Sequence, residues 1–259
     1  MSLKSTGAKP WLRNALIAAQ VLFALGVVVG GAPMVAIAQE YVPPNRGIPG
    51  RREGGGTRGC WSSASNIPLD LPLTALVPQQ NIGYTLVGYP TFYLYVPQFY
   101  AEQATAAEFV LSDVDGNEVY KTTFQTNDTA GIISLSLPES ANLPPLEVGK
   151  DYHWSFSLVC DVSDRSADVV VDSWIQRVEP DAQLSAALQT TPPAQLPNLY
   201  ARSGIWYDAL TSVVQLRQQP EQDVPAAQWE TLLNSVELDD VARYTSIESV
   251  NLGQGGGAR

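Results

Sequence analysis

Short runs of alternating polar and apolar residues fill the middle of the chain, from 73 to 178. The run 91–96 would place phenylalanine, leucine and valine on one face of a strand and two tyrosines on the other. Two further runs, 108–112 and 118–122, flank a turn rich in aspartate, glycine and asparagine. The pattern therefore predicts short β-strands and a β-hairpin rather than helices.

The longest alternation ends at Cys160. Large side chains recur at every second position and would share one face of a strand: Tyr152, Trp154, Phe156, Leu158 and Cys160. The leucine and glycine before Tyr152 resemble the tyrosine corner of fibronectin type III and other immunoglobulin-like domains, in which the tyrosine hydroxyl bonds to upstream backbone. The spacing of the strands favours an antiparallel immunoglobulin-like β-sandwich over βαβ units.

After residue 178 the apolar period changes from two to that of a helix. The pattern predicts a short helix over 179–188, a helix over 198–218 and another that starts at Pro225. We expect the last two to form an antiparallel hairpin that buries Trp206 and Trp229 against the sandwich or against each other. The predicted fold class is α+β, with a C-terminal helical hairpin.

The N-terminus has the layout of a secretory signal peptide. A basic stretch precedes an apolar run over 15–29, and an Ala-x-Ala sequence ends at Ala38. We expect cleavage after Ala38 and a periplasmic or secreted product with no transmembrane segment. The alternative is an uncleaved anchor, because 15–38 could span roughly 30 Å of hydrocarbon as a helix.

The net negative charge limits the classes of molecule that we expect this protein to bind. The chain has 15 basic and 26 acidic residues, and cleavage would remove Lys4, Lys9 and Arg13, leaving 12 basic against 26 acidic. Such an acidic protein, with a pI near 4.5, lacks the clustered positive charge that nucleic acids require. Another envelope protein or a cell-wall glycan is the kind of partner we expect.

Residues 39–62 form a Gly/Pro/Arg-rich segment that predicts a flexible linker. We expect the β-sandwich domain over 63–179, a helical region packed on it over 180–252 and a disordered tail over 253–259. The linker is either a solvated tether or a cationic arm that contacts lipid headgroups, cell-wall polymer or the protein's own acidic body. Its basic residues are Arg46, Arg51, Arg52 and Arg58.

The chain has two cysteines, Cys60 and Cys160. In an oxidising compartment they would pair and join the end of the linker to the sandwich. Closing a loop of roughly 100 residues would stabilise the fold by about 4–5 kcal/mol in the chain-entropy model.

Two acidic segments are candidate cation-binding sites. The turn 113–117 lacks the glycine and glutamate that an EF-hand loop needs at its sixth and twelfth positions, so a hairpin turn is favoured. The second segment could bind a hard cation, or its aspartates could serve turn formation and an exposed strand face. Its residues are Asp161, Asp164, Asp168 and Asp172.

The segment 200–209 concentrates aromatic and charged residues. One interpretation is a ligand-binding surface made by Arg202, Trp206, Tyr207 and Asp208. The other is core packing of a helix in which Gly204 admits a close neighbour.

Nothing in the sequence forms a recognisable catalytic constellation. His153 is the single histidine, and its odd spacing from Cys160 puts the two on opposite faces of a strand. We expect no catalytic residue, metal or cofactor, and therefore a non-enzymatic interaction or ligand-binding module, or a structural partner in an envelope complex. The alternative is a glycan- or cell-wall-active hydrolase that uses two carboxylates.

Several blocks of the chain resemble a family of secreted cyanobacterial proteins, the domain of unknown function 928. The arginine- and glycine-rich stretch 49–60 is the most specific, and 73–78, 90–97, 146–160, 174–178 and 200–210 continue it. The resemblance implies a location in the envelope of a photosynthetic bacterium. It implies no activity and no catalytic residue.

Overall fold

The structure is a computed structural model, and it describes residues 40–54, 60, 71–126, 130–139, 143–218, 225–244, 246–250 and 252. The predicted signal peptide and the predicted C-terminal tail lie outside these residues.

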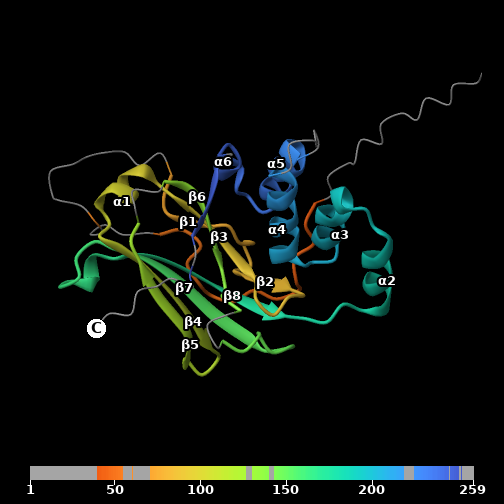
Figure 1. Cartoon of the computed structure of the whole chain (residues 1–259), viewed down its shortest axis with the longest axis horizontal. Helices are drawn as coiled ribbons and strands as arrows, with labels where there is room; N and C mark the ends of the chain where they lie inside the picture. Colours follow the sequence, from red (N-terminus) through yellow and green to blue (C-terminus); the bar gives the residue numbers. More distant parts are fainter. Residues whose placement is uncertain are drawn as a thin grey trace, which may run out of the picture. The chain divides into compact units, whose positions relative to one another are not determined.

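Two β-sheets are present, together with six helices, in the described part of the chain (Figure 1). The five-stranded sheet has the order β2 (Ile82–Thr85), β8 (Val169–Arg177), β7 (Asp151–Val159), β4 (Ala106–Asp113) and β5 (Glu118–Phe124). The four-stranded sheet has the order β1 (Thr74–Ala75), β3 (Thr91–Val96), β6 (Gly131–Ser136) and β9 (Ile247–Val250).

The expectation of purely antiparallel sheets is wrong at two edges. β2 pairs with β8 in parallel, and β9 pairs with β6 in parallel, whereas the other strand pairs are antiparallel. Parallel neighbours cannot be joined by a tight turn, and here long stretches of chain separate the two members of each pair. β9 also lies inside the region 180–252, which was expected to be helical.

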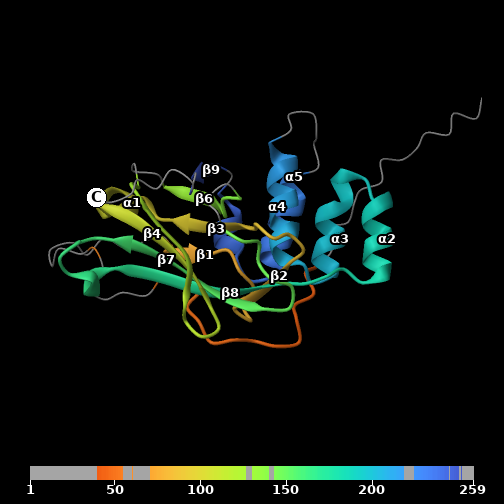
Figure 2. The same cartoon turned by 60° about the horizontal axis from the view of Figure 1, so that its bottom comes forward.

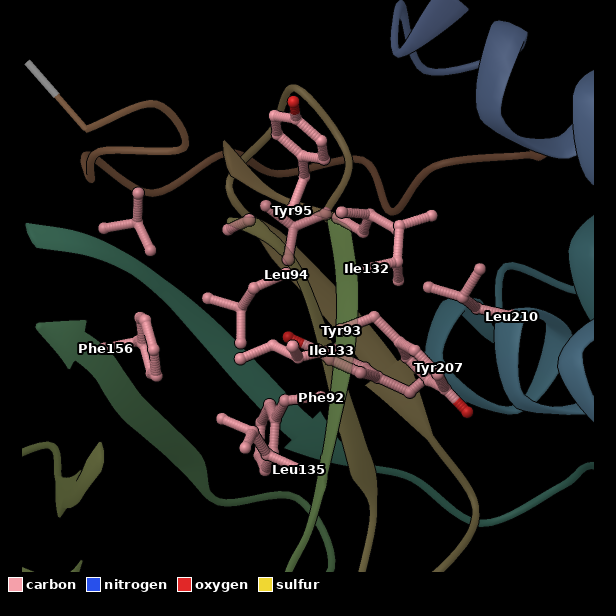
Figure 3. Close-up of a cluster of buried hydrophobic side chains, with 14 of the residues drawn as sticks. Phe92, Tyr93, Leu94, Tyr95, Ile132, Ile133, Leu135, Phe156, Tyr207 and Leu210 are labelled. Carbon is pink, nitrogen blue, oxygen red and sulfur yellow. The ribbon is translucent and has the colours of Figure 1, made fainter. Parts of the chain in front are cut away.

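The two sheets pack face to face through aromatic side chains. The ring of Phe92 on β3 lies 5.0 Å from that of Phe109 on β4 and 5.1 Å from that of Trp154 on β7, between centroids. Figure 3 shows Phe92 and Leu135 of the smaller sheet in this cluster of buried side chains. The four members of the alternating set that lie in β7, Tyr152, Trp154, Phe156 and Leu158, are buried, as the period of two predicts, and Cys160 is partly buried.

The second face of β3 is buried as well. Tyr93 and Tyr95 are each 4% exposed, because the helical region covers this side of the sheet. The Tyr93 hydroxyl donates to Thr211, and the Tyr95 hydroxyl donates to Tyr244 at 2.9 Å. Burial raises the pKa of Tyr93 to about 12.

Two local predictions in the strands are confirmed. β4 and β5 form an antiparallel hairpin whose turn is held by Asp113, which accepts hydrogen bonds from the backbone amides of Asp115 and Asn117. The Tyr152 hydroxyl accepts a hydrogen bond from the backbone amide of Glu147 at 3.1 Å, the contact typical of a tyrosine corner.

Helices follow β8, and α2, α3 and α4 lie side by side in both views (Figures 1 and 2). The predicted helix 198–218 is in fact two helices, because Gly204 has a φ of +74° and ends the first of them. The helices are α1 (Gln98–Gln103), α2 (Ala182–Thr190), α3 (Leu196–Arg202), α4 (Trp206–Arg217), α5 (Pro225–Asn234) and α6 (Asp239–Ala242).

The start of α4 is part of the core between the sheets. Trp206 is fully buried, and its indole donates to the backbone oxygen of Leu76 at 2.9 Å. Tyr207 accepts a hydrogen bond from the Trp154 indole at 2.9 Å. Trp229 on α5 is also buried and donates to the backbone oxygen of Ala242. The prediction that both tryptophans are buried is confirmed.

Residues 40–54, here called the N-terminal strap, differ from the expected flexible linker. The strap hydrogen-bonds to both sheets: the amide of Asp172 on β8 donates to the oxygen of Arg51, and that of Ala75 on β1 donates to the oxygen of Arg52. Tyr41 is 3% exposed and packs against Trp206. These contacts supply the apolar burial and backbone pairing that composition alone did not predict.

Candidate functional site

The Cys60–Cys160 disulfide is present, with the two Cα atoms 5.0 Å apart. It closes a sequence separation of 100 residues and attaches the chain after the strap to the end of β7. The predicted pairing is therefore confirmed, and both sulfur atoms are committed to structure rather than to nucleophilic chemistry.

The side chains of two arginines in the predicted linker, Arg46 and Arg52, contact the protein itself. Arg46 forms a two-pronged ion pair with Asp151, with N–O distances of 2.8 and 2.5 Å, and this hydrogen bonding raises the pKa of Arg46. Arg52 donates to the backbone oxygens of Val236 and Glu237. Of the interpretations offered for a cationic arm, contact with the acidic body is the one seen for Arg46. Arg58 lies outside the described residues.

The aspartates after Cys160 are engaged in local structure. Asp161 accepts hydrogen bonds from the amide and hydroxyl of Ser163, and Asp164 does the same for Ser166. Asp168 pairs with the guanidinium of Arg165 at 2.6 Å. These bonds lower the pKa values of Asp161 and Asp164. No group of three or more metal-ligating side chains occurs in the described ranges.

His153 lies on the side of β7 opposite the core and contacts β8. Its Nε2 lies 3.0 Å from Asp172 Oδ2, and its ring is 4.9 Å from that of Trp174. Asp172, the fourth aspartate of the cation interpretation, is thus occupied by this contact.

The residues proposed for a binding surface separate into two groups. Trp206 and Tyr207 are 0% and 2% exposed and belong to the core, whereas Arg202 is exposed at the end of α3. Gly204 lies so close to the strap that an added Cβ would be 2.9 Å from the backbone oxygen of Val42. These positions favour the packing interpretation for the aromatic residues. Asp208 has a different environment.

Asp208 is a buried acid at the edge of a cleft. It lies in the first turn of α4 and is 9% exposed. Its Oδ2 accepts two hydrogen bonds, from the Thr85 hydroxyl at 2.7 Å and from the Leu86 amide at 3.1 Å. Burial raises the pKa of Asp208, and hydrogen bonds from Thr85, from the Leu86 amide and from its own backbone amide oppose this shift.

The cleft has a volume of about 320 Å³ and lies between the ends of β2 and β3 and the helices α3 and α4. Hydroxyl, amide and aromatic side chains make up most of its lining, and Asp208 is the one charged residue that lines it among the described residues. Its lining includes Thr85, Tyr89, Tyr200, Tyr207, Asp208 and Gln215.

Three polar groups in this cleft are not used by the protein. Asp208 Oδ1, the Tyr200 hydroxyl and the Gln215 side-chain amide make no hydrogen bond to another described residue. An unused acceptor, a hydroxyl and an amide that line one cleft can bind a polar ligand directly.

A second groove lies between α2, α3 and the end of β8, with a volume of about 570 Å³. Two acids line it, Glu179 and Asp181, together with Arg202. Asp181 Oδ1 accepts the amide of Leu184 at 2.7 Å and caps α2, so this acid has a structural role.

A model of the family described as Domain of Unknown Function (DUF928) matches residues 53–246 of this chain. The chain belongs to the DUF928 family. The DUF928 match contains both cysteines and the residues that line the Asp208 cleft, whereas most of the strap and β9 lie outside it. No curated protein matches the chain.

The sequence analysis identified some of the residues that line the Asp208 cleft of this DUF928 protein. Tyr200, Tyr207 and Asp208 fall in the segment 200–209 that stood out by composition. It missed Thr85, Tyr89 and Gln215, which are ordinary residues in their local context. Gln215 follows Asp208 by two turns of α4, whereas Thr85 reaches Asp208 only through the packing of α4 against β2.

Proposed function

We propose that this DUF928 protein is a non-enzymatic ligand-binding module that holds a small polar ligand in the Asp208 cleft. The observation that carries the proposal is the difference in hydrogen bonding between the two oxygens of the Asp208 carboxylate. One oxygen is held by Thr85 and Leu86, and the other makes no hydrogen bond to another described residue. An acid positioned in this way can bind a ligand without any further rearrangement.

The alternative, a glycan- or cell-wall-active hydrolase, has less support. Two-carboxylate hydrolysis needs a second acid across the bound substrate, several ångströms from the first. Asp208 is the one acid among the described residues that line its cleft, and Asp181 in the second groove caps a helix. A role as a structural partner in an envelope complex has no specific contact in its favour.

We propose that the protein is exported. The Cys60–Cys160 disulfide supports this, because such bonds persist in oxidising compartments and are rare in the bacterial cytosol. Among the helices of the described residues, none is long and apolar enough to cross a bilayer. Cleavage after Ala38 remains a proposal, and N-terminal sequencing of the protein recovered from its native host tests it.

We also propose that the sheets form an immunoglobulin-like sandwich followed by an antiparallel helical hairpin. The neighbours β1-β3-β6 and β8-β7-β4-β5 correspond to the strand orders A-B-E and G-F-C-C′ of such domains. The tyrosine-corner bond of Tyr152 at the start of β7, the equivalent of strand F, supports the same assignment. Contact between Arg217 of α4 and the Trp229 ring of α5, at 4.8 Å, supports the hairpin.

The experiment for the binding function is a comparison of ligand classes with the mature, disulfide-bonded protein. Thermal melts are recorded with neutral methyl glycosides, small carboxylates, alkylammonium ions and Ca²⁺, and the same compounds are tested by ligand-observed NMR. We expect one class to raise the melting temperature, and we expect Asp208→Asn to remove the effect. Asp115→Asn in the β4–β5 turn, which lies outside the cleft lining, is the matched control.

Two results would overturn the proposal. One is that no class binds. The other is turnover of a nitrophenyl glycoside or of cell-wall fragments that disappears in Asp208→Asn and not in Asp115→Asn, which would favour the hydrolase.

A further inference from the structure

We propose that the ligand of the Asp208 cleft is one neutral pyranose unit of a glycan. This inference rests on the binding function proposed above and adds the chemical class of the ligand. It depends on the unused hydrogen-bonding groups of the cleft, on its aromatic residues and on its charge.

The unused polar groups match the hydroxyls of a sugar. When Asp208 is ionised, its Oδ1 accepts hydrogen bonds and donates none. The Tyr200 hydroxyl and the Gln215 amide can both donate and accept hydrogen bonds. Sugar hydroxyls also donate and accept, so adjacent hydroxyls of one ring can satisfy such a mixed set. A ligand that only donates could not use the donor groups of the Gln215 amide and the Tyr200 hydroxyl.

The aromatic residues of the cleft are suited to the apolar face of a pyranose. Tyr89 and Tyr200 both line it and are only partly buried, so part of each side chain is available to a ligand. The Tyr89 hydroxyl donates to the backbone oxygen of Leu143 at 2.9 Å, which holds that side chain in place before any ligand arrives. A fixed tyrosine offers a large contact area at a small entropic cost.

The charge of the cleft disfavours anions and cations. No Lys, Arg or His is among the described residues that line it, so an anionic ligand would meet no opposite charge. Thr85 and Leu86 already donate to Asp208 Oδ2, which leaves less negative charge for a cation than an exposed carboxylate would offer. The volume of about 320 Å³ is at the lower end of the range for ligand sites and suits a single ring.

The test uses methyl α- and β-glycosides of glucose, galactose, mannose and N-acetylglucosamine as probes. Tetramethylammonium, acetate and Ca²⁺ serve as comparison ligands. Binding is measured by NMR titration of the mature, disulfide-bonded protein. We expect at least one methyl glycoside to bind with a dissociation constant on the order of 1 mM, as is typical of a small ligand that makes few contacts.

Asp208→Asn is the informative variant. Its side-chain oxygen can still accept from Thr85 and Leu86, while an NH₂ group replaces the oxygen that accepts from neither. We expect about tenfold weaker glycoside binding or a greater loss, a fold-change consistent with one hydrogen bond to a charged group. Gln215→Ala, at an exposed helical position, should weaken binding without affecting the fold, and Asp115→Asn should leave it unchanged.

The outcomes separate the inference from the function on which it rests. Binding of tetramethylammonium, acetate or Ca²⁺ that depends on Asp208, with no glycoside binding, would overturn the pyranose assignment and keep the binding function. Glycoside binding that survives both Asp208→Asn and Gln215→Ala would also overturn the assignment, because the sugar would then lie elsewhere. A failure of every probe to bind would overturn both.

Discussion

The hydroxyl of Tyr207 accepts a hydrogen bond from the indole of Trp154 at 2.9 Å and joins α4 to the middle strand of the larger sheet. The same hydroxyl lies 3.3 Å from the backbone oxygen of Trp174 on β8, to which it donates. Both aromatic side chains are almost completely buried, at 2% and 0% exposure. The Tyr207 hydroxyl therefore links the helix to two strands of the sheet within a largely apolar core.

Replacing Tyr207 with phenylalanine tests this contact. The variant leaves the Trp154 indole without its acceptor inside the core, so we expect a loss of about 1–3 kcal/mol in the free energy of unfolding. Urea denaturation followed by tryptophan fluorescence measures it. Tyr93→Phe is the control, because its bond to Thr211 is long, at 3.4 Å, and Thr211 is only partly buried. Equal losses in the two variants would contradict the role given to Tyr207.

A pair of glycines separates backbone strain from close packing. Gly204 and Gly116 have φ angles of +74° and +81°. A Cβ built on Gly204 would lie 2.9 Å from the backbone oxygen of Val42, whereas nothing lies within 4 Å of a Cβ built on Gly116. We expect Gly116→Ala to cost about 1 kcal/mol, the penalty for the left-handed conformation alone. Gly204→Ala should cost more, about 2 kcal/mol or above, because the strap must also move. Similar losses in chemical denaturation would show that the strap does not pack tightly at Gly204.

We expect the Cys60–Cys160 disulfide to make a large contribution to the free energy of unfolding. Cys60→Ser with Cys160→Ser removes a link across 100 residues, and we expect a loss of about 2–5 kcal/mol. Reduction of the wild-type protein by dithiothreitol should give the same change in urea midpoint. A double variant as stable as the oxidised wild type would show that the link contributes nothing.

The buried carboxyl of Asp208 predicts a pH-dependent contribution to stability. Its pKa is raised above the ordinary value of 3.8, so the native state holds this proton to higher pH than the unfolded chain. The contribution of Asp208 therefore decreases as the pH rises from the unfolded pKa through the raised native pKa. The difference in free energy of unfolding between Asp208→Asn and the wild type should shift in favour of the variant across this window.

Urea denaturation at a series of pH values from 3 upward, roughly one unit apart, measures that difference. The subtraction cancels the opposite contributions of Asp113, Asp161 and Asp164, whose pKa values are lowered by hydrogen bonds. A difference that does not change with pH would contradict the prediction.

Local patterns were sufficient to predict several elements of this fold. The β4–β5 hairpin, the tyrosine corner at Tyr152 and the short helix after β8 depend on residues a few positions apart. Backbone geometry sets periods of two and about 3.6 residues, so such elements are visible in the order of polar and apolar residues. The disulfide was predictable for a simpler reason, since the chain has only two cysteines.

The sequence by itself thus determined the strand pattern, the helical character of most of the C-terminal region and the one disulfide pairing. Only the tertiary structure decided the parallel edges made by β2 and β9, the docking of the strap and the cleft at Asp208. Thr85 and Asp208 bond across 123 positions of sequence, and no local period carries information about such a contact. It exists because α4 packs its buried face against β2 and the core, and this packing brings unrelated polar residues to one place.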